Sequence, residues 1–330
     1  MNHSNKKKQF YDLTPDKVLH GVDQAGFLTT GEYFQLNSYE NRVFDIHLEP
    51  DDNPKELRNR LITKFYRPER WSLDAIMDEH NFLNELRQEG IPAVAPIKQK
   101  NGKTVSSSEG IFMALFPKIW GRLPQELNQE QFKKIGRTLA RIHNIGEQKI
   151  AENRPSLTVR EYGWPALDIL HDRVAVEVWN RYEDAAVAIL EHLEEVLDES
   201  QYLRIHGDCH KGNLLLTDFK DLPQDFLFVD FDDFCNGPPA QDFWMLFSGD
   251  SEESRFEQEW ILSGYEELRS FDDRQLDLML PLRGLRIIHY AAWIARRWDD
   301  PSFPNLFPQF QDYSYWAQET ESLEKIAWSL

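Results

Sequence analysis

Three polar side chains in one stretch of the sequence have the types and the spacing to act together. Asn213 follows Asp208 by five positions, and Asp230 comes after two further short apolar runs. Amide and carboxylate oxygens are hard ligands, which suit a Mg²⁺ ion that holds a polyphosphate. The carboxylate of Asp208 is not needed for such a metal and could take a proton from a hydroxyl. We therefore interpret Asn213 and Asp230 as a metal site and Asp208 as a base.

The two apolar runs, Leu214–Leu216 and Phe226–Val229, must bring these side chains together. Each run has the length and composition of a strand, and a polar turn separates them, so we expect an antiparallel hairpin. Such a hairpin places Asn213, at the start of one strand, near Asp230, at the end of the other, with Asp208 beside both. The alternative is a polar loop followed by a solvated acidic turn, with no function.

The order of these residues resembles the catalytic loop and the metal-binding aspartate of the protein-kinase-like superfamily. The resemblance implies that Asp208 is the catalytic base, that Asn213 holds a metal, and that Asp230 is both catalytic and metal-binding. It also implies that Asp242 anchors the catalytic loop by accepting backbone N–H bonds. The matched residues are His206, Gly207, Asp208, Asn213, Asp230 and Asp242.

A lysine and a glutamate in the N-terminal part fit the same pattern. Lys64 lies inside a predicted strand, Leu61–Tyr66, and Ser72 is a predicted N-cap for the helix that follows. Glu79 falls on the apolar stripe of that helix, where a buried carboxylate needs a partner. The resemblance supplies Lys64 as the strand lysine that contacts the α and β phosphates and pairs with Glu79.

Two further cofactor-binding residues are expected from position alone. Ser38 lies in the turn where a protein kinase has its glycine-rich loop, but this turn contains no glycine. Its hydroxyl or backbone N–H could still bind a phosphate, or the turn could have no function. Phe116 and Pro117 stand where the resemblance places the interlobe hinge, whose backbone groups contact adenine.

The pattern of strands and helices predicts an α+β, bilobal, protein-kinase-like fold. We expect an N-terminal nucleotide-binding lobe over residues 1–117, with a five-stranded antiparallel sheet and a helix. A larger, mainly helical catalytic and acceptor-binding lobe then covers residues 118–330 and includes an apolar stretch at 282–298. The aromatic residues near the end are expected to be core, although their exposed part could shape an acceptor pocket. The strands are expected at Tyr33–Leu36, Arg42–Leu48, Leu61–Tyr66, Ala95–Lys98 and Ile111–Pro117.

Composition narrows the class of protein and its partners. Of 330 residues, 41% are hydrophobic, which favours a folded protein, and no apolar run approaches a membrane span. The basic start has no apolar core after it and is no secretory signal. Cys209 and Cys235 are the only cysteines, which indicates a reducing, cytoplasmic location. We expect both side chains to fill small buried spaces. The net charge of −19 argues against nucleic acid as a partner and would favour a cationic substrate. Alternatively, this charge serves only to keep the protein soluble.

The wider sequence resembles one bacterial family of kinases. Only eleven residues separate Asp230 from Asp242, so a long activation segment is absent, as in small-molecule kinases. The segments LNSYENRV, KFYRPERW, HGDCHKGN and DDFCNGPPAQDFWML resemble the stress response kinase A family over about residues 10–320. The resemblance implies a monomeric, cytoplasmic enzyme that uses Mg²⁺ and ATP to phosphorylate protein serine or threonine under stress.

Two other functions remain open at this point. One is a small-molecule hydroxyl kinase of the aminoglycoside, choline or homoserine type, which the short segment after Asp230 and a cationic substrate would fit. The other is a nucleotide-binding pseudokinase or scaffold, against which the complete set of motif residues argues.

Overall fold

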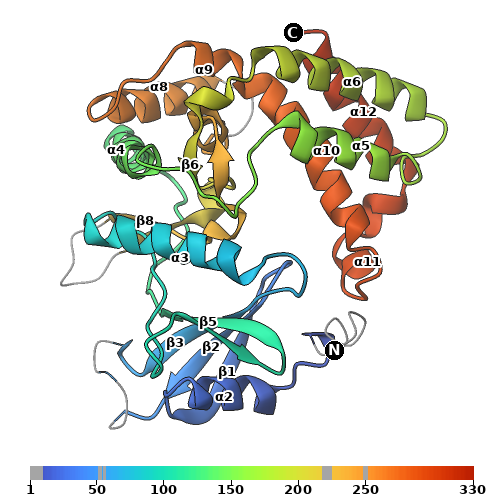
Figure 1. Cartoon of the computed structure of the whole chain (residues 1–330). Helices are drawn as coiled ribbons and strands as arrows, with labels where there is room; N and C mark the ends of the chain where they lie inside the picture. Colours follow the sequence, from blue (N-terminus) through green and yellow to red (C-terminus); the bar gives the residue numbers. More distant parts are fainter. Residues whose placement is uncertain (1–9, 51–53, 55–56, 218–224, 248–251) are drawn as a thin grey trace. The chain divides into compact units, whose positions relative to one another are not determined.

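The computed structural model describes two compact units, each formed from separate segments of the chain (Figure 1). The residues described are 10–50, 54, 57–217, 225–247 and 252–330. Unit 1 comprises Met1–Ile145, Glu152–Arg154 and Lys211–Asp232. Unit 2 comprises Gly146–Ala151, Pro155–His210 and Asp233–Leu330. The boundary expected at residue 117 stays a prediction.

A five-stranded antiparallel sheet forms the centre of unit 1, in the order β1-β2-β3-β5-β4. Lys64 lies in the middle strand, where its register partners are Val43 and Ala114. Strands on both sides therefore hold its backbone in place. The strands are β1 Thr29–Leu36, β2 Arg42–Leu48, β3 Arg60–Phe65, β4 Val105–Ser108 and β5 Ile111–Pro117.

Helices cover both faces of this sheet: α2 (Pro15–Gln24) lies on one side and α3 (Leu73–Gln88) on the other (Figure 1). Leu61 and Phe65 of β3 belong to the core that includes α2. Because side chains alternate along a strand, Lys64 points to the opposite face, toward α3. Unit 1 also contains nearly all of α4 (Gln129–Gly146).

One predicted strand is wrong. The segment Ala95–Lys98 forms no strand, and the hairpin partner of β5 is β4, at Val105–Ser108. Ile97 N–H donates to Leu115 O at 2.7 Å, but Pro96 has no N–H with which to continue a ladder. The tight turn of the hairpin therefore lies immediately before β5, where both residues between the strands have positive φ angles.

The hairpin predicted next to Asn213 and Asp230 is present within unit 1. β7 (Leu214–Thr217) pairs antiparallel with β8 (Asp225–Phe228), and its turn lies outside the described residues. Val229 N–H donates to Asn213 O at 3.0 Å. The hairpin therefore brings Asn213 and Asp230 to the same end, as expected.

Unit 2 is mainly helical, and its core contains much of the aromatic C-terminal sequence, as predicted. α6, α10 and α12 lie side by side in Figure 1 and share one buried cluster. Two short strands, β6 (Leu203–Ile205) and β9 (Cys235–Gly237), pair antiparallel. The helices are α5 Trp164–Leu170, α6 Trp179–Val196, α7 Pro239–Trp244, α8 Glu252–Glu266, α9 Arg274–Asp277, α10 Met279–Arg296, α11 Phe303–Leu306 and α12 Tyr313–Ala327.

Short helical turns complete the chain: η2 Val159–Gly163, η3 Glu199–Gln201, η4 Lys211–Asn213, η5 Phe231–Asp233 and η6 Pro308–Gln311. Across the described part of the chain, none of the helices has both the length and the apolar character that crossing a membrane requires. The sheet of unit 1 and the helices of unit 2 together give the predicted α+β class.

Candidate active site

Lys64 is the central cation of unit 1. Its Nζ lies 2.6 Å from Asp232 Oδ1, 3.6 Å from Glu79 Oε1 and 3.8 Å from Asp230 Oδ1. Burial alone would lower the pKa of this ammonium group, but the charges of Asp232 and Glu79 hold its pKa well above the ordinary value. Lys64 is therefore a fixed positive charge beside carboxylates that come from α3 and from the segment after β8.

Glu79 has two cationic partners, of which Arg154 is the nearer. Arg154 Nη2 donates to Glu79 Oε2 at 2.7 Å, and its other nitrogens donate to the backbone oxygens of Ala75 and Asp232, both at 2.8 Å. Burial raises the pKa of Glu79, and the charges of Lys64 and Arg154 oppose that shift. The predicted contact between Lys64 and Glu79 is present, but it is part of a larger network that includes Arg154.

Asp232 joins this network through a second arginine, and sequence reasoning missed both residues. It is buried and accepts a short hydrogen bond from Arg70, which also lies 3.5 Å from Glu40. Although burial would raise the pKa of Asp232, the charges of Arg70 and Lys64 hold it well below its ordinary value. The signal was present, because Asp232 is the second acid of VDFDD and Arg70 lies in KFYRPERW.

Asp230 differs from Asp232 in being accessible. Its side chain is 59% exposed, and its backbone has φ 61°, a left-handed conformation that aspartate adopts more readily than most residues. Such local strain is common at functional sites and is consistent with a side chain held for binding. Asp230 therefore presents an exposed oxygen ligand, and the half-buried Asn213 lies at the same end of the β7–β8 hairpin.

These two residues fit a divalent cation that arrives with its phosphates. No group of three or more His, Cys, Asp or Glu side chains within the described ranges is arranged to hold a metal alone. Mg²⁺ commonly binds through one or two protein carboxylates, with substrate phosphates and water completing its coordination. The donor set of Asn213 and Asp230 fits that mode and not a closed structural metal site.

Ser38 and Phe116 lie in unit 1 with different exposure. Ser38 is exposed in the turn between β1 and β2, and its Oγ accepts a bond from Asn41 N–H at 3.3 Å. Phe116 is buried in β5, and its ring lies 6.0 Å from that of His80. Their nucleotide-binding roles stay predictions.

In unit 2, Asp242 anchors the loop that contains Asp208, as the sequence predicts. Its carboxylate accepts bonds from His206 N–H at 2.7 Å and Gly207 N–H at 2.8 Å. Gly207 has φ +82°, and a Cβ there would lie 2.2 Å from Asp233 O. Only glycine fits this position, so the loop before Asp208 has one well-defined path.

Asp208 is held by an arginine that the sequence reasoning missed. Arg286 Nη2 donates to Asp208 Oδ1 at 2.7 Å, and His210 Nε2 lies 3.5 Å from Oδ2. Burial alone would raise the pKa of Asp208, but the hydrogen bond from His210 and the charge of Arg286 lower it well below its ordinary value. Asp208 is therefore an ionised, oriented acceptor. The missed signal is an arginine in the mainly apolar stretch at 282–298, in RGLRIIHY.

A small cavity of ≈ 30 Å³ lies beside this loop, within unit 2. Gly207, Asp233, Arg286 and His289 contribute to its lining. Burial lowers the pKa of His289 to about 4, so its ring is neutral at pH 7. The cavity thus offers polar groups next to Asp208. The predicted convergence of Asp208 with the metal site stays a prediction.

Comparison with known proteins identifies the family. A model of the phosphotransferase enzyme family APH matches residues 35–278. Stress response kinase A of Escherichia coli K12 is 36% identical over 323 residues, which cover 96% of this chain and 93% of that protein. Serine/threonine protein kinase RdoA of Salmonella typhimurium LT2 is 37% identical over 314 residues, which cover 94% and 92%.

Solved structures with lower identity share the fold. An amicoumacin kinase in complex with AMP-PNP, Ca²⁺ and its ligand aligns with a TM-score of 0.74 at 17% identity, covering 98% of this chain and 96% of that one. A microcompartment-associated aminopropanol kinase aligns with a TM-score of 0.72 at 19% identity, covering 94% and 98%. The predicted kinase-like fold is confirmed, and the chain belongs to the phosphotransferase enzyme family APH and, within it, to the stress response kinases A.

Proposed function

We propose that this kinase transfers the γ-phosphoryl group of ATP to serine or threonine hydroxyls of a protein. The observation that carries the proposal is the cluster in unit 1, where the fixed cation Lys64 lies beside the exposed carboxylate of Asp230, at the end of the hairpin where Asn213 also lies. The name of the Salmonella relative, which is 37% identical, supports a protein acceptor. Cytoplasmic location, a monomeric state and a role in stress are parts of the same proposal.

Unit 1 would bind the nucleotide. Lys64 would bind the α and β phosphate oxygens, with its charge maintained by the surrounding carboxylates. Asn213 and Asp230 would hold Mg²⁺, which when bound neutralises charge on the β and γ phosphates. Ser38 would contribute a hydroxyl or a backbone N–H to a phosphate, and the backbone at Phe116 would contact adenine.

Unit 2 would supply the base. A bond forms between the acceptor oxygen and the γ phosphorus as the bond from that phosphorus to the β-bridging oxygen breaks, and ADP leaves. Asp208 orients the hydroxyl and takes its proton. Because the pKa of Asp208 is low, its main contribution is orientation, and the proton moves late, as the loose transition state of phosphoryl transfer permits.

Two variants test these roles separately. Asp208→Ala should keep Mg²⁺-dependent nucleotide binding, measured by calorimetry, while turnover falls by several powers of ten. Asp230→Ala should lose Mg²⁺-dependent binding as well as turnover. If either variant phosphorylates at the wild-type rate, the role given to that residue is wrong.

A small-molecule hydroxyl kinase is the second candidate, because the structural neighbours named above are kinases of amicoumacin and of aminopropanol. Radiolabelled ATP should be offered with protein substrates and, separately, with amino alcohols, choline, homoserine and aminoglycosides. Mass spectrometry after incubation with Mg·ATP, alone and with cell lysate, would detect phosphoserine or phosphothreonine. Transfer to a small alcohol but to no protein would favour the second candidate.

A further inference from the structure

The helix that carries Arg286 has an unusual charge for this chain. α10 (Met279–Arg296) contains Arg283, Arg286 and Arg296 but no aspartate or glutamate, and Arg297 follows as its C-cap. The chain as a whole has a net charge of −19. A purely cationic helix on so acidic a protein indicates a local role for positive charge.

Four residues of this helix and its C-cap residue form one surface, which we call the α10 stripe. They are separated by three, four, three and four positions, so they share one face of the helix. From Arg286 onward, neighbouring members also touch. The members are Arg283, Arg286, Tyr290, Trp293 and Arg297.

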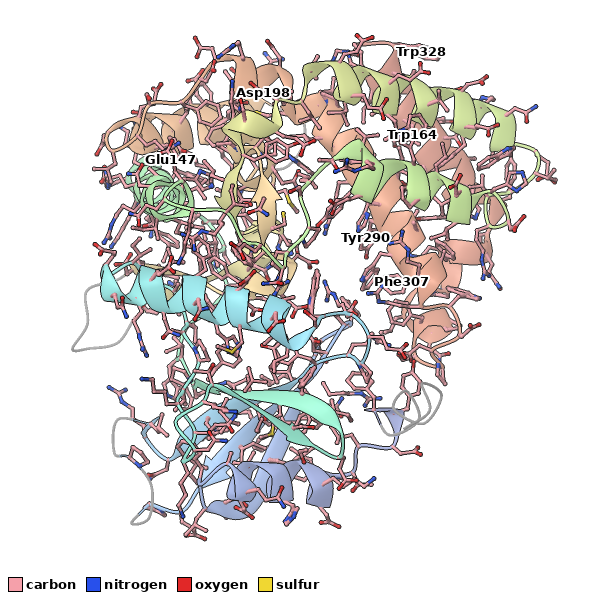
Figure 2. All side chains as sticks on the ribbon, viewed as in Figure 1. Glu147, Trp164, Asp198, Tyr290, Phe307 and Trp328 are labelled. Carbon is pink, nitrogen blue, oxygen red and sulfur yellow. The ribbon has the colours of Figure 1, made fainter. Side chains whose placement is uncertain are left out.

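Ring and cation contacts run along the stripe. The guanidinium of Arg286 lies 5.7 Å from the ring centroid of Tyr290, and that of Arg297 lies 4.9 Å from Trp293. Between them, the rings of Tyr290 and Trp293 stack at 5.4 Å with an interplanar angle of 11°. Phe307 packs against Tyr290 at 6.3 Å, and Figure 2 shows both side chains in the same part of unit 2.

Within unit 2, two members of the stripe are exposed and the other three are half-buried. Tyr290 is 37% exposed and the Arg286 side chain is 29% exposed. Arg283 is exposed, and among the residues that the structure describes it has no carboxylate partner. A flat aromatic surface with arginines along it suits a polar, negatively charged chain more than an apolar one.

The stripe begins at the base. Because Arg286 donates to Asp208 at 2.7 Å, an acceptor hydroxyl bound to Asp208 would lie next to the stripe. From Arg286 to Arg297 the helix rises by roughly 16 Å, which is the length of about five residues of extended peptide. A residue of the acceptor within about five positions of the phosphorylated one would therefore reach Arg297.

We propose that the α10 stripe binds the acceptor protein through an acidic segment that flanks the phosphorylated serine or threonine, an inference that rests on the proposed protein-kinase function. Acidic groups also occur nearby: Asp208, which is paired with Arg286, and Asp233, which lines the adjacent cavity. The net negative charge of the chain does not exclude binding of an acidic segment, because charges beyond about 8 Å are screened at physiological ionic strength.

Three synthetic peptides test the proposal. Each has one central serine, flanked on both sides by five residues that are rich in Glu, in Gln or in Lys. Phosphorylation by the full-length enzyme gives kcat and KM separately for each peptide. The Arg283→Gln/Arg297→Gln variant removes two charges of the stripe. Arg181→Gln/Arg274→Gln removes two other exposed arginines of unit 2 and is the matched control.

The wild type should prefer the Glu peptide to the Gln peptide, and the Lys peptide should be the poorest. The stripe variant should lose about three- to tenfold of that preference through KM, as two partly exposed ionic contacts would give. The control variant should retain it. An unchanged preference in the stripe variant, or a wild-type preference for the Lys peptide, would overturn the inference but leave the proposed function intact.

A binding experiment covers the case in which none of the peptides is phosphorylated. Fluorescence anisotropy with a labelled Glu peptide that has alanine in place of serine measures docking alone. Binding that weakens in the stripe variant and with added salt supports the docking surface. Absence of binding overturns it. Transfer to small alcohols but not to any peptide or protein would instead reject the proposed function.

Discussion

Replacing Arg286 by Gln should make the activity sensitive to acid. In the wild type, the pKa of Asp208 is held well below its ordinary value by the hydrogen bond from His210 and the charge of Arg286. Two unit charges 4 Å apart interact by about 4 kcal/mol at an effective dielectric constant of ~20. The Arg286 side chain is 29% exposed, so the contact is worth less, roughly 1.5–3 kcal/mol.

That free energy corresponds to an upward shift of about 1–2 units in the pKa of Asp208. Because the proposed role of Asp208 as the base requires its ionised form, activity should be lost as the pH falls through this pKa. The midpoint pH of the acid limb of kcat should therefore rise by the same amount. The assay is kcat for γ-phosphoryl transfer at saturating substrate between pH 2 and pH 8, because an acid limb set by a pKa so far below 3.8 lies below pH 4. Circular dichroism at each pH confirms that the protein is folded.

Arg286→Lys is the matched control, since it keeps the charge and loses the guanidinium fork. Its acid limb should stay close to that of the wild type, even if kcat falls. Identical pH profiles for the wild type and Arg286→Gln would refute the electrostatic role. An equal shift in the Lys and Gln variants would show that geometry, and not charge, controls the carboxylate.

Three further predictions concern stability. Arg154→Met should cost about 3–5 kcal/mol in urea unfolding, because it leaves the buried Glu79 without its nearer cation; a cost below about 1 kcal/mol would contradict this. Gly207→Ala should lower the free energy of unfolding by several times the ~1 kcal/mol expected for Gly102→Ala, because Gly102 has a similar positive φ but open space around it. Equal losses in the two variants would show that no clash occurs at Gly207. Burial lowers the pKa of His80 from 6.5 to about 3, so the folded state resists protonation. Because of this resistance to protonation, the free energy of unfolding should fall by about 2 kcal/mol from pH 6.5 to pH 5. The His80→Asn variant should lack this dependence on pH.

Local sequence signals predicted much of unit 1. The bounds of β2 and β5 were predicted to the residue, because β-branched and aromatic runs end at polar turns or at proline. Ser72 does cap α3, where its Oγ accepts a bond from Ala75 N–H at 3.1 Å. The error at Ala95–Lys98 arose because an apolar run was read as a strand although Pro96 interrupts it.

The ion pairs were harder to predict, since they join residues far apart in the sequence. Arg154 and Glu79 are 75 positions apart, and Arg286 and Asp208 are 78 apart. No periodicity or spacing rule connects such residues, and neither arginine, taken alone, indicates its partner. By contrast, Lys64 and Glu79 follow a family spacing, which is why that contact could be expected.

The most direct test of the account is the position of the metal. Crystals grown with AMP-PNP and Mn²⁺, which replaces Mg²⁺ and scatters anomalously, would locate the ion without assumption. We expect an anomalous peak bonded to the side-chain oxygens of both Asn213 and Asp230 and to phosphate oxygens of the nucleotide. A peak held by other residues, or a bound nucleotide with no metal contact to Asp230, would contradict it.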